Sequence, residues 1–151
     1  MELRLFAAGV SLDRNKITQR AGCAVVLVAE DAGRAKYREI AHGLDSMTGS
    51  QSELRAAYLA LAAVRPGARS DPVSLSVGSY PAQILERRGD SYAVTPRSNE
   101  RLVEQLRVLA GQFPRLTVSS RRSDEFVRAG ELARVSAQDQ SQLDTGSQDR
   151  N

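Results

Sequence analysis

The spacing of apolar residues changes once along this chain, and that change limits the fold more than any other feature. Up to residue 42 the apolar residues follow β-strand patterns. From residue 50 onward, segments with helical spacing alternate with short strand-like segments. Strands joined by short turns pair antiparallel, and strands joined through helices pair parallel. The sequence therefore predicts an α/β protein whose mixed sheet joins an antiparallel meander to a parallel half.

Three strand-like segments occupy the first third of the chain. Residues 2–9 and 36–42 alternate between apolar and polar side chains, whereas residues 22–29 form a continuous apolar run. A short continuous run is typical of a central strand that is buried on both faces. A turn around Gly33 separates the second and third segments, so we expect all three to form an antiparallel meander.

The remaining segments carry helix signals between two further strands. The sequence Ser50-Gln-Ser-Glu53 is a capping box, and apolar residues follow it at helical spacing until Pro66-Gly67. Later segments show similar start and stop signals. We expect helices that begin near Ser50, Ser79, Ser98 or Asn99, and Asp124, and strands at 73–77 and 115–120. The predicted element order is βββαβαβα around five strands.

The last segment of the chain differs in composition from the rest. Residues 138–151 are almost entirely polar, with Leu143 as their only large apolar side chain. Such a segment buries too little apolar surface to offset the entropy of ordering. We therefore expect one folded domain over residues 1–137, followed by a disordered tail.

Composition excludes several classes of protein. No run of 18 apolar residues exists, and the N-terminal residues lack the pattern of a secretory signal, so the expected location is the cytoplasm. The single cysteine, Cys23, excludes an internal disulfide. The net charge is +3, and all basic residues except Lys16 and Lys36 are arginines. Arginine binds phosphate well, but codon bias in a GC-rich genome explains the same excess.

Four short motifs resemble those of the ribonuclease H family. The stretch from Thr48 to Leu61 resembles the family's Thr-x-Asn-x-x-Glu-x-x-Ala block, in which the glutamate opens the first helix. Residues 6–11 resemble the first-strand motif, residues 76–79 the fourth-strand Thr-Asp-Ser motif, and residues 129–134 the last-helix motif. The motifs occur in the right order over residues 2–137, so the resemblance implies the ribonuclease H fold.

This chain departs from the family at the acidic positions. In the family, four acidic side chains hold two Mg²⁺ ions. The corresponding residues here are Ala8, Glu53, Gly78 and Gly130, so only one acid remains. The family's histidine-bearing loop before the last helix is also absent, because residues 119–124 contain no histidine.

The missing acids decide the expected activity. Two divalent cations held roughly 3.5–4 Å apart need several carboxylates to balance four positive charges. One glutamate is insufficient, and alanine and glycine supply no side-chain ligand. We therefore expect no Mg²⁺ binding and a catalytically inactive relative of ribonuclease H. Glu53 itself is either a remaining metal ligand or the capping-box glutamate of Ser50, and the sequence favours the cap.

Other acids, the cysteine and the histidine are weaker candidates for a replacement site. Candidates for relocated ligands are Asp13, Asp71, Asp124, Glu125 and Glu131, but a displaced metal site would still need a central acid on the first strand. Cys23 lies within a predicted buried strand and is interpreted as a core residue. His42 has no partners for nucleophilic catalysis and is interpreted as structural or exposed.

Polar and basic residues around the predicted cleft suggest nucleic-acid binding. The family grips an RNA–DNA hybrid through backbone and 2′-OH contacts. The loop that makes such contacts retains hydrogen-bonding side chains, and the loss of acids reduces repulsion of phosphates. The candidate binding residues are Thr48, Ser50, Gln51, Arg87, Arg88, Arg121 and Arg122.

Three functions remain open from the sequence. The first is a protein that binds a nucleic-acid duplex, such as an RNA–DNA hybrid, without cleaving it. The second is a protein-interaction or self-association module that uses the same fold through an apolar patch or an exposed sheet edge. The third is a metal-dependent ribonuclease H with relocated carboxylates.

Overall fold

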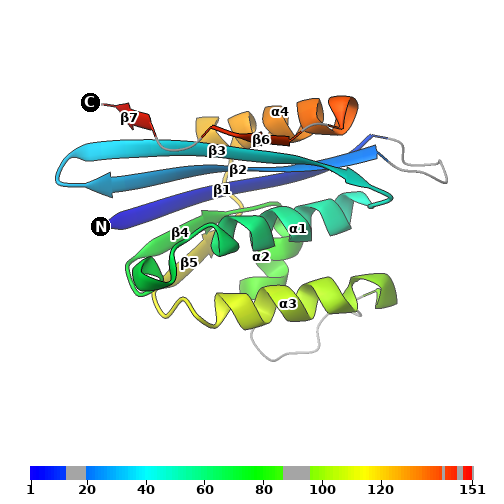
Figure 1. Cartoon of the computed structure of the whole chain (residues 1–151). Helices are drawn as coiled ribbons and strands as arrows, with labels where there is room; N and C mark the ends of the chain where they lie inside the picture. Colours follow the sequence, from blue (N-terminus) through cyan, green and yellow to red (C-terminus); the bar gives the residue numbers. More distant parts are fainter. Residues whose placement is uncertain (13–19, 87–95, 141, 146–147, 151) are drawn as a thin grey trace.

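A mixed β-sheet with helices on both faces forms the centre of the computed structural model, which describes residues 1–12, 20–86, 96–140, 142–145 and 148–150 (Figure 1). Short 3₁₀ turns lie at Pro66–Ala68 and Arg97–Asn99. The strands are β1 (Glu2–Ser11), β2 (Arg20–Asp31), β3 (Arg34–Asp45), β4 (Val73–Ser76), β5 (Leu116–Ser119), β6 (Gln142–Asp144) and β7 (Gln148–Arg150). The helices are α1 (Gly49–Ala62), α2 (Ser79–Glu86), α3 (Glu100–Ala110) and α4 (Asp124–Asp139).

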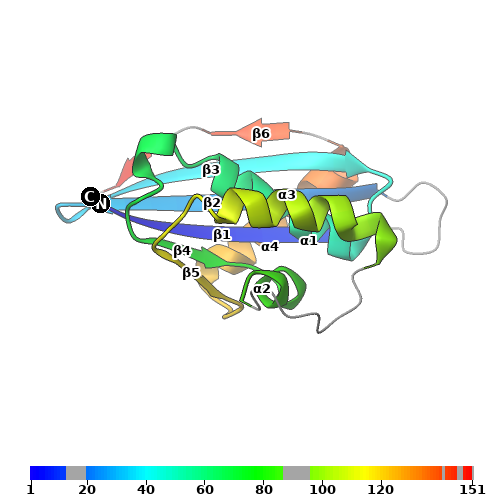
Figure 2. The same cartoon turned by 90° about the horizontal axis from the view of Figure 1, so that it is seen from below.

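The sheet has the predicted mixed topology. Its strand order is β5-β4-β1-β2-β3-β6, and β7 also pairs with β3 (Figure 2). Strands β1, β2 and β3 form an antiparallel meander, whereas β4 pairs parallel with β1 and β5 pairs parallel with β4. The β2–β3 turn has positive φ at Ala32 and Gly33, which matches the right-handed twist of a two-residue hairpin. The α/β prediction is therefore confirmed.

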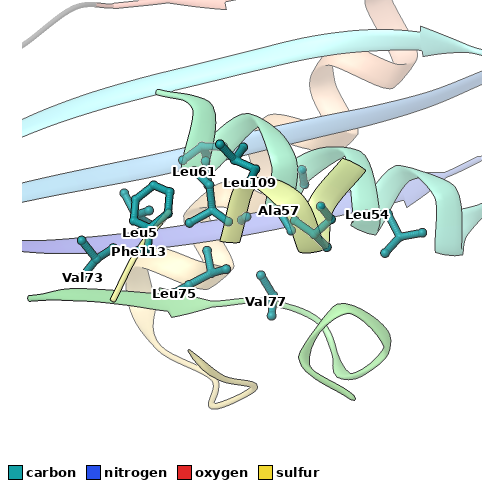
Figure 3. Close-up of a cluster of buried hydrophobic side chains, with 14 of the residues drawn as sticks. Leu5, Leu54, Ala57, Leu61, Val73, Leu75, Val77, Leu109 and Phe113 are labelled. Atoms are coloured by element: carbon teal, nitrogen blue, oxygen red, sulfur yellow. The ribbon is translucent and has the colours of Figure 1, made fainter. Parts of the chain in front are cut away.

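Two hydrophobic layers hold the helices to the sheet. Helices α1, α2 and α3 cover one face, and α4 covers the other (Figure 1). Leu5 of β1 and Leu75 of β4 belong to one cluster with Leu54 and Leu61 of α1 (Figure 3), and all four are essentially inaccessible to solvent. Burial of each such leucine contributes roughly 1.5–3 kcal/mol to folding. Alternate side chains of β1 therefore point into the hydrophobic layer on the α1 side of the sheet: Leu3, Leu5 and Ala7.

Glycines let α4 approach the sheet backbone directly. A Cβ at Gly22 of β2 would overlap the Ala133 carbonyl and lie 2.9 Å from the Ala137 amide nitrogen. A Cβ at Gly43 of β3 would lie 2.8 Å from the Cα of Gln140. The absence of side chains at these positions therefore fixes how closely α4 packs on β2 and β3.

The helix caps differ from those predicted. Thr48, rather than Ser50, caps α1, and Gln51, rather than Glu53, completes the capping box. Ser123, rather than Asp124, caps α4 and accepts a hydrogen bond from the Phe126 amide. The interpretation of Glu53 as a capping residue is therefore wrong. Both spacings fit a capping box, and only the tertiary structure selects between them.

The C-terminal segment also differs from the prediction. Helix α4 continues to Asp139, and β6 and β7 pair antiparallel with β3. Pairing at a sheet edge uses backbone groups and needs no apolar side chains, so composition alone did not reveal it. Within the described residues the sheet therefore has seven strands, where the sequence predicted five. No helix in those residues is long and apolar enough to span a bilayer.

Candidate functional site

Ala8 and Gly78 both follow the point where β4 leaves β1. The last parallel pair between the two strands is Phe6 with Ser76, so Ala8 and Gly78 each lie two residues beyond it. Ala8 is only 6% exposed and packs in the cluster between the sheet and α4. That cluster includes Phe6, Val26 and Ala129. The surroundings of Ala8 are therefore apolar.

Helix α1 brings Glu53 to the same place. A Cβ at Gly9 would overlap the Ser52 carbonyl and the Glu53 amide, so the helix backbone rests on β1 next to Ala8. A Cβ at Gly78 would overlap the Glu53 carboxylate and lie 2.8 Å from its Cδ. The carboxylate of Glu53 therefore occupies the space that a side chain at position 78 would need.

Glu53 is an acid without an acidic or basic partner in the described residues. Its pKa is raised above the usual value because burial desolvates the charged form. None of the ion pairs found in the described part of the chain involves it. The Glu53 carboxylate is therefore isolated from other charged groups of the described residues and partly shielded from water.

Gly130 lies on α4 and does not touch this acid. A Cβ at Gly130 would meet no atom within 4 Å, so the position faces open space. Its neighbour Ala129 packs in the same cluster as Ala8. The structure therefore brings Glu53 against Gly78 and beside Gly9 of β1, whereas the Ala8 side chain packs toward α4, the helix that carries Gly130.

The candidate replacement acids do not gather around Glu53. No three His, Cys, Asp or Glu side chains in the described residues are grouped so that they could share a metal ion. Asp124 and Glu125 instead line a separate cavity of about 410 Å³ together with Glu39 and Arg128. Arg128 forms an ion pair with Glu39 and contacts Glu131 at 3.9 Å. Asp71 precedes β4 at the opposite end of that strand, and Asp13 lies outside the described residues.

The predicted binding residues at the start of α1 belong to an internal hydrogen-bond network. The backbone amide of Gln51 donates to Thr48 Oγ1 at 3.2 Å, and the backbone amide of Thr48 donates to Gln51 Oε1 at 3.0 Å. Asn99 Nδ2 donates to Ser50 Oγ at 3.2 Å. These groups stabilise the helix end, and a nucleic acid would have to use their remaining hydrogen-bonding capacity.

Asn99 has a role that the sequence analysis did not predict. It is 2% exposed and stands at the start of α3, but its side chain makes no cap hydrogen bond. Instead, Nδ2 donates to both Ser50 Oγ and the Tyr80 hydroxyl, each at 3.2 Å. The starts of α1, α2 and α3 therefore meet at Asn99. The only sequence signal was an asparagine near a helix start, which cannot distinguish a cap from a buried tether.

The four predicted arginines fall into two groups. Arg121 and Arg122 are exposed in the link between β5 and α4, immediately before the cap residue Ser123. Arg87 and Arg88 lie outside the described residues. The structure thus gives one exposed basic pair near the N-terminal end of α4.

Cys23 is confirmed as a core residue. The side chain is fully buried in β2, and burial raises the pKa of its thiol to about 11. A thiol with such a pKa is protonated at neutral pH and is a poor nucleophile. His42 is half-buried on β3, directly opposite Cys23 in the sheet register.

Replacement of Glu53 by glutamine is expected to stabilise the protein at pH 7 and to have no effect near pH 3. The raised pKa means that the unfolded chain loses this proton at lower pH than the folded chain does. The wild type therefore loses stability as the pH rises from below 4.5 through the folded-state pKa, and the variant does not. Urea unfolding at both pH values measures the difference, with Glu104→Gln on the exposed face of α3 as control. A destabilised Glu53→Gln variant at pH 7 would show that the carboxylate is held by a favourable partner.

Comparison with solved structures finds this architecture in ribonucleases H. RNase H1 from the halophilic archaeon Halobacterium salinarum is 20% identical, with a TM-score of 0.70 over 93% of this chain and 100% of that chain. The N-terminal RNase H domain of a Mycobacterium tuberculosis protein is 20% identical, with a TM-score of 0.72 over 91% and 94%. A foamy viral protease-reverse transcriptase in complex with an RNA/DNA hybrid is 14% identical, with a TM-score of 0.69 over 89% and 20%.

No protein-family model and no curated protein matches the sequence. The likeness therefore rests on three-dimensional structure: the strand order, the mixed pairing and the distribution of helices over the two faces. These features extend over nearly the whole chain in the first two comparisons. The chain has the ribonuclease H fold.

Proposed function

We propose that this protein binds a nucleic-acid duplex, such as an RNA–DNA hybrid, without cleaving it. The observation that carries the proposal is the isolated carboxylate of Glu53, which fills the space beside Gly78, while position 8 of β1 is an alanine and supplies no second carboxylate. Such a site lies where ribonucleases H of this fold carry their catalytic centre, but it lacks the negative charge of the other acidic side chains. The protein is then a pseudoenzyme rather than a nuclease.

The donor set does not fit a pair of magnesium ions. Mg²⁺ requires oxygen ligands in nearly octahedral geometry, and a two-metal centre needs carboxylates that bridge or flank both ions. Ala8 and Gly78 offer no side-chain oxygen, and Ala8 is surrounded by apolar groups.

Duplex binding is supported by what surrounds this site. The Thr48, Ser50 and Gln51 side chains stand at the start of α1, one helical turn from Glu53, and Arg121 and Arg122 are exposed near the start of α4. Loss of three acids removes charge that would repel phosphates. The foamy viral protein of the same fold was solved with an RNA/DNA hybrid, and we extend that type of ligand to this chain.

Binding is expected to weaken steeply with salt. A protein that neutralises three to four phosphates loses on the order of 100-fold in duplex affinity between 50 and 200 mM salt. Fluorescence anisotropy with a labelled hybrid measures this slope. The Arg121→Ala/Arg122→Ala variant should lower the slope by about two, whereas Arg134→Ala on the exposed far half of α4 should change it little.

Two results would contradict the proposal. One is the absence of hybrid binding at 50 mM salt, which would remove the nucleic-acid partner. The other is cleavage of the hybrid in Mg²⁺ or Mn²⁺ that disappears in the Glu53→Gln variant, which would instead support a nuclease with relocated carboxylates.

A further inference from the structure

Strand β3 lies near an edge of the sheet, and the C-terminal segment of the same chain occupies that edge. Gln142, Leu143 and Asp144 of β6 pair antiparallel with His42, Ala41 and Ile40. The Thr145 amide donates to the Glu39 carbonyl at 3.0 Å, and the Glu39 amide donates to Thr145 Oγ1 at 3.2 Å. Figure 2 shows β6 outside β3, at the side of the sheet opposite β5. The backbone groups of β3 therefore accept an added strand.

Charge complementarity accompanies the backbone pairing. Arg38 holds the Asp144 carboxylate with two hydrogen bonds, Nε to Oδ1 at 3.1 Å and Nη2 to Oδ2 at 2.7 Å. Arg34, Lys36 and Arg38 alternate along β3, so their side chains leave the same face of the sheet. The register of β7 sets Asp149 opposite Lys36. The carboxylate of Asp144 thus lies at a basic row of β3.

The side chains of β6 bury little surface. All three side chains of β6 are exposed, including Leu143 at 36%, so the strand buries almost no apolar surface. The Arg38–Asp144 pair is itself largely exposed to solvent, where ion pairs are weak. A strand held mainly by backbone pairing is one that another strand of similar chemistry can replace.

We propose that the β3 edge is a docking surface for an extended, acidic segment of another protein, and that the chain's own strands β6 and β7 cover this surface until such a partner replaces them. The partner pairs antiparallel with β3 and presents a carboxylate to Arg38 where Asp144 now lies. A peptide fits this edge better than a nucleic acid does, because the hydrogen bonds that it offers run from backbone to backbone.

The test uses the full chain with its own strand loosened. The Asp144→Ala/Thr145→Ala variant removes the ion pair and the hydroxyl contact, and both side chains are exposed, so the fold is retained. Asp139→Ala at the exposed end of α4 removes the same charge and is the matched control. The probe is a labelled synthetic peptide with the sequence of residues 141–150. Peptide affinity is measured by anisotropy, and amide hydrogen exchange along β3 is measured without peptide.

The double variant should bind the peptide at least fivefold more tightly than the wild type or Asp139→Ala does. Exchange along β3 should be faster in the double variant, and added peptide should slow it again. A further Arg38→Ala substitution, or a peptide that carries Asp144→Asn, should reverse the gain in affinity. Equal affinity for all variants, or no binding at millimolar peptide, would overturn the proposal. Dimerisation of the double variant without peptide binding would also overturn it, because the occupant would then be a second copy.

Discussion

Replacement of Gly9 by alanine is expected to destabilise the protein by about 3 kcal/mol, at the upper end of the usual cost of overpacking. The added methyl group would overlap the Ser52 carbonyl and the Glu53 amide. Both are backbone groups inside α1, so the whole helix must move and the core at Leu54 must open. For a domain of this size, such a loss corresponds to a fall in Tm of roughly 6–12 °C.

Gly130→Ala supplies the control for that prediction. A Cβ there meets nothing within 4 Å, and alanine is the better helix former, so this variant should gain about 1 kcal/mol. Thermal unfolding of both variants beside the wild type gives the comparison. If Gly9→Ala were as stable as the wild type, α1 would not rest on β1, and Glu53 would have no fixed place beside Gly78.

Restoration of an acid at the first-strand position is expected to be costly. Ala8→Asp would set a carboxylate at a position that is 6% exposed, among Phe6, Val26 and Ala129. A buried charge without a partner costs several kcal/mol, so we expect a loss of about 3 kcal/mol or more at pH 7. Because burial raises the pKa of such an acid, the loss should shrink as the pH falls and the carboxyl group is protonated in both states.

The effect of Mg²⁺ tells whether Ala8→Asp is destabilised by a buried charge that nothing can pair or by a metal site that is merely empty. Denaturant unfolding of Ala8→Asp is measured with and without 10 mM Mg²⁺, and Ala8→Ser serves as a polar control of similar size. We expect Mg²⁺ to recover none of the lost stability, because Gly78 and Gly130 still supply no ligand. Recovery of stability specific to Mg²⁺ and to the aspartate variant would mean that the cleft remains able to bind metal.

Much of the fold was predictable from the sequence because burial imposes a period on each element. The alternation at 2–9 and the continuous run at 22–29 located β1 and β2, and Gly33 located the turn before β3. The order of helices and strands after residue 50 then required parallel crossovers. These signals are local, and each agrees with the packing that the structure shows.

The wrong predictions concern a helix start where two capping boxes fit the sequence, and a strand whose formation depends on backbone pairing. Thr48 with Gln51 and Ser50 with Glu53 have the same capping-box spacing, and the structure contains the first pair. The strand β6 depends on the free edge of β3, which leaves no mark on the sequence of residues 142–144.

The candidate site was located by resemblance rather than by periodicity. Spacing along the chain does not reveal that Glu53 of α1 meets Gly78 after β4 and the backbone of β1 at Gly9, because these residues lie on separate elements. Asn99 illustrates the same limit, since its two hydrogen bonds reach α1 and α2 from the start of α3. Such long-range contacts depend on the assembled fold.

The most direct test of the account is isothermal titration of Mg²⁺, followed by a short RNA–DNA hybrid, into the same sample of the intact protein. The account predicts no heat of Mg²⁺ binding at millimolar concentration, together with saturable binding of the hybrid that does not depend on Mg²⁺. Saturable Mg²⁺ binding that is lost in Glu53→Gln, or hybrid binding that requires Mg²⁺, would contradict it.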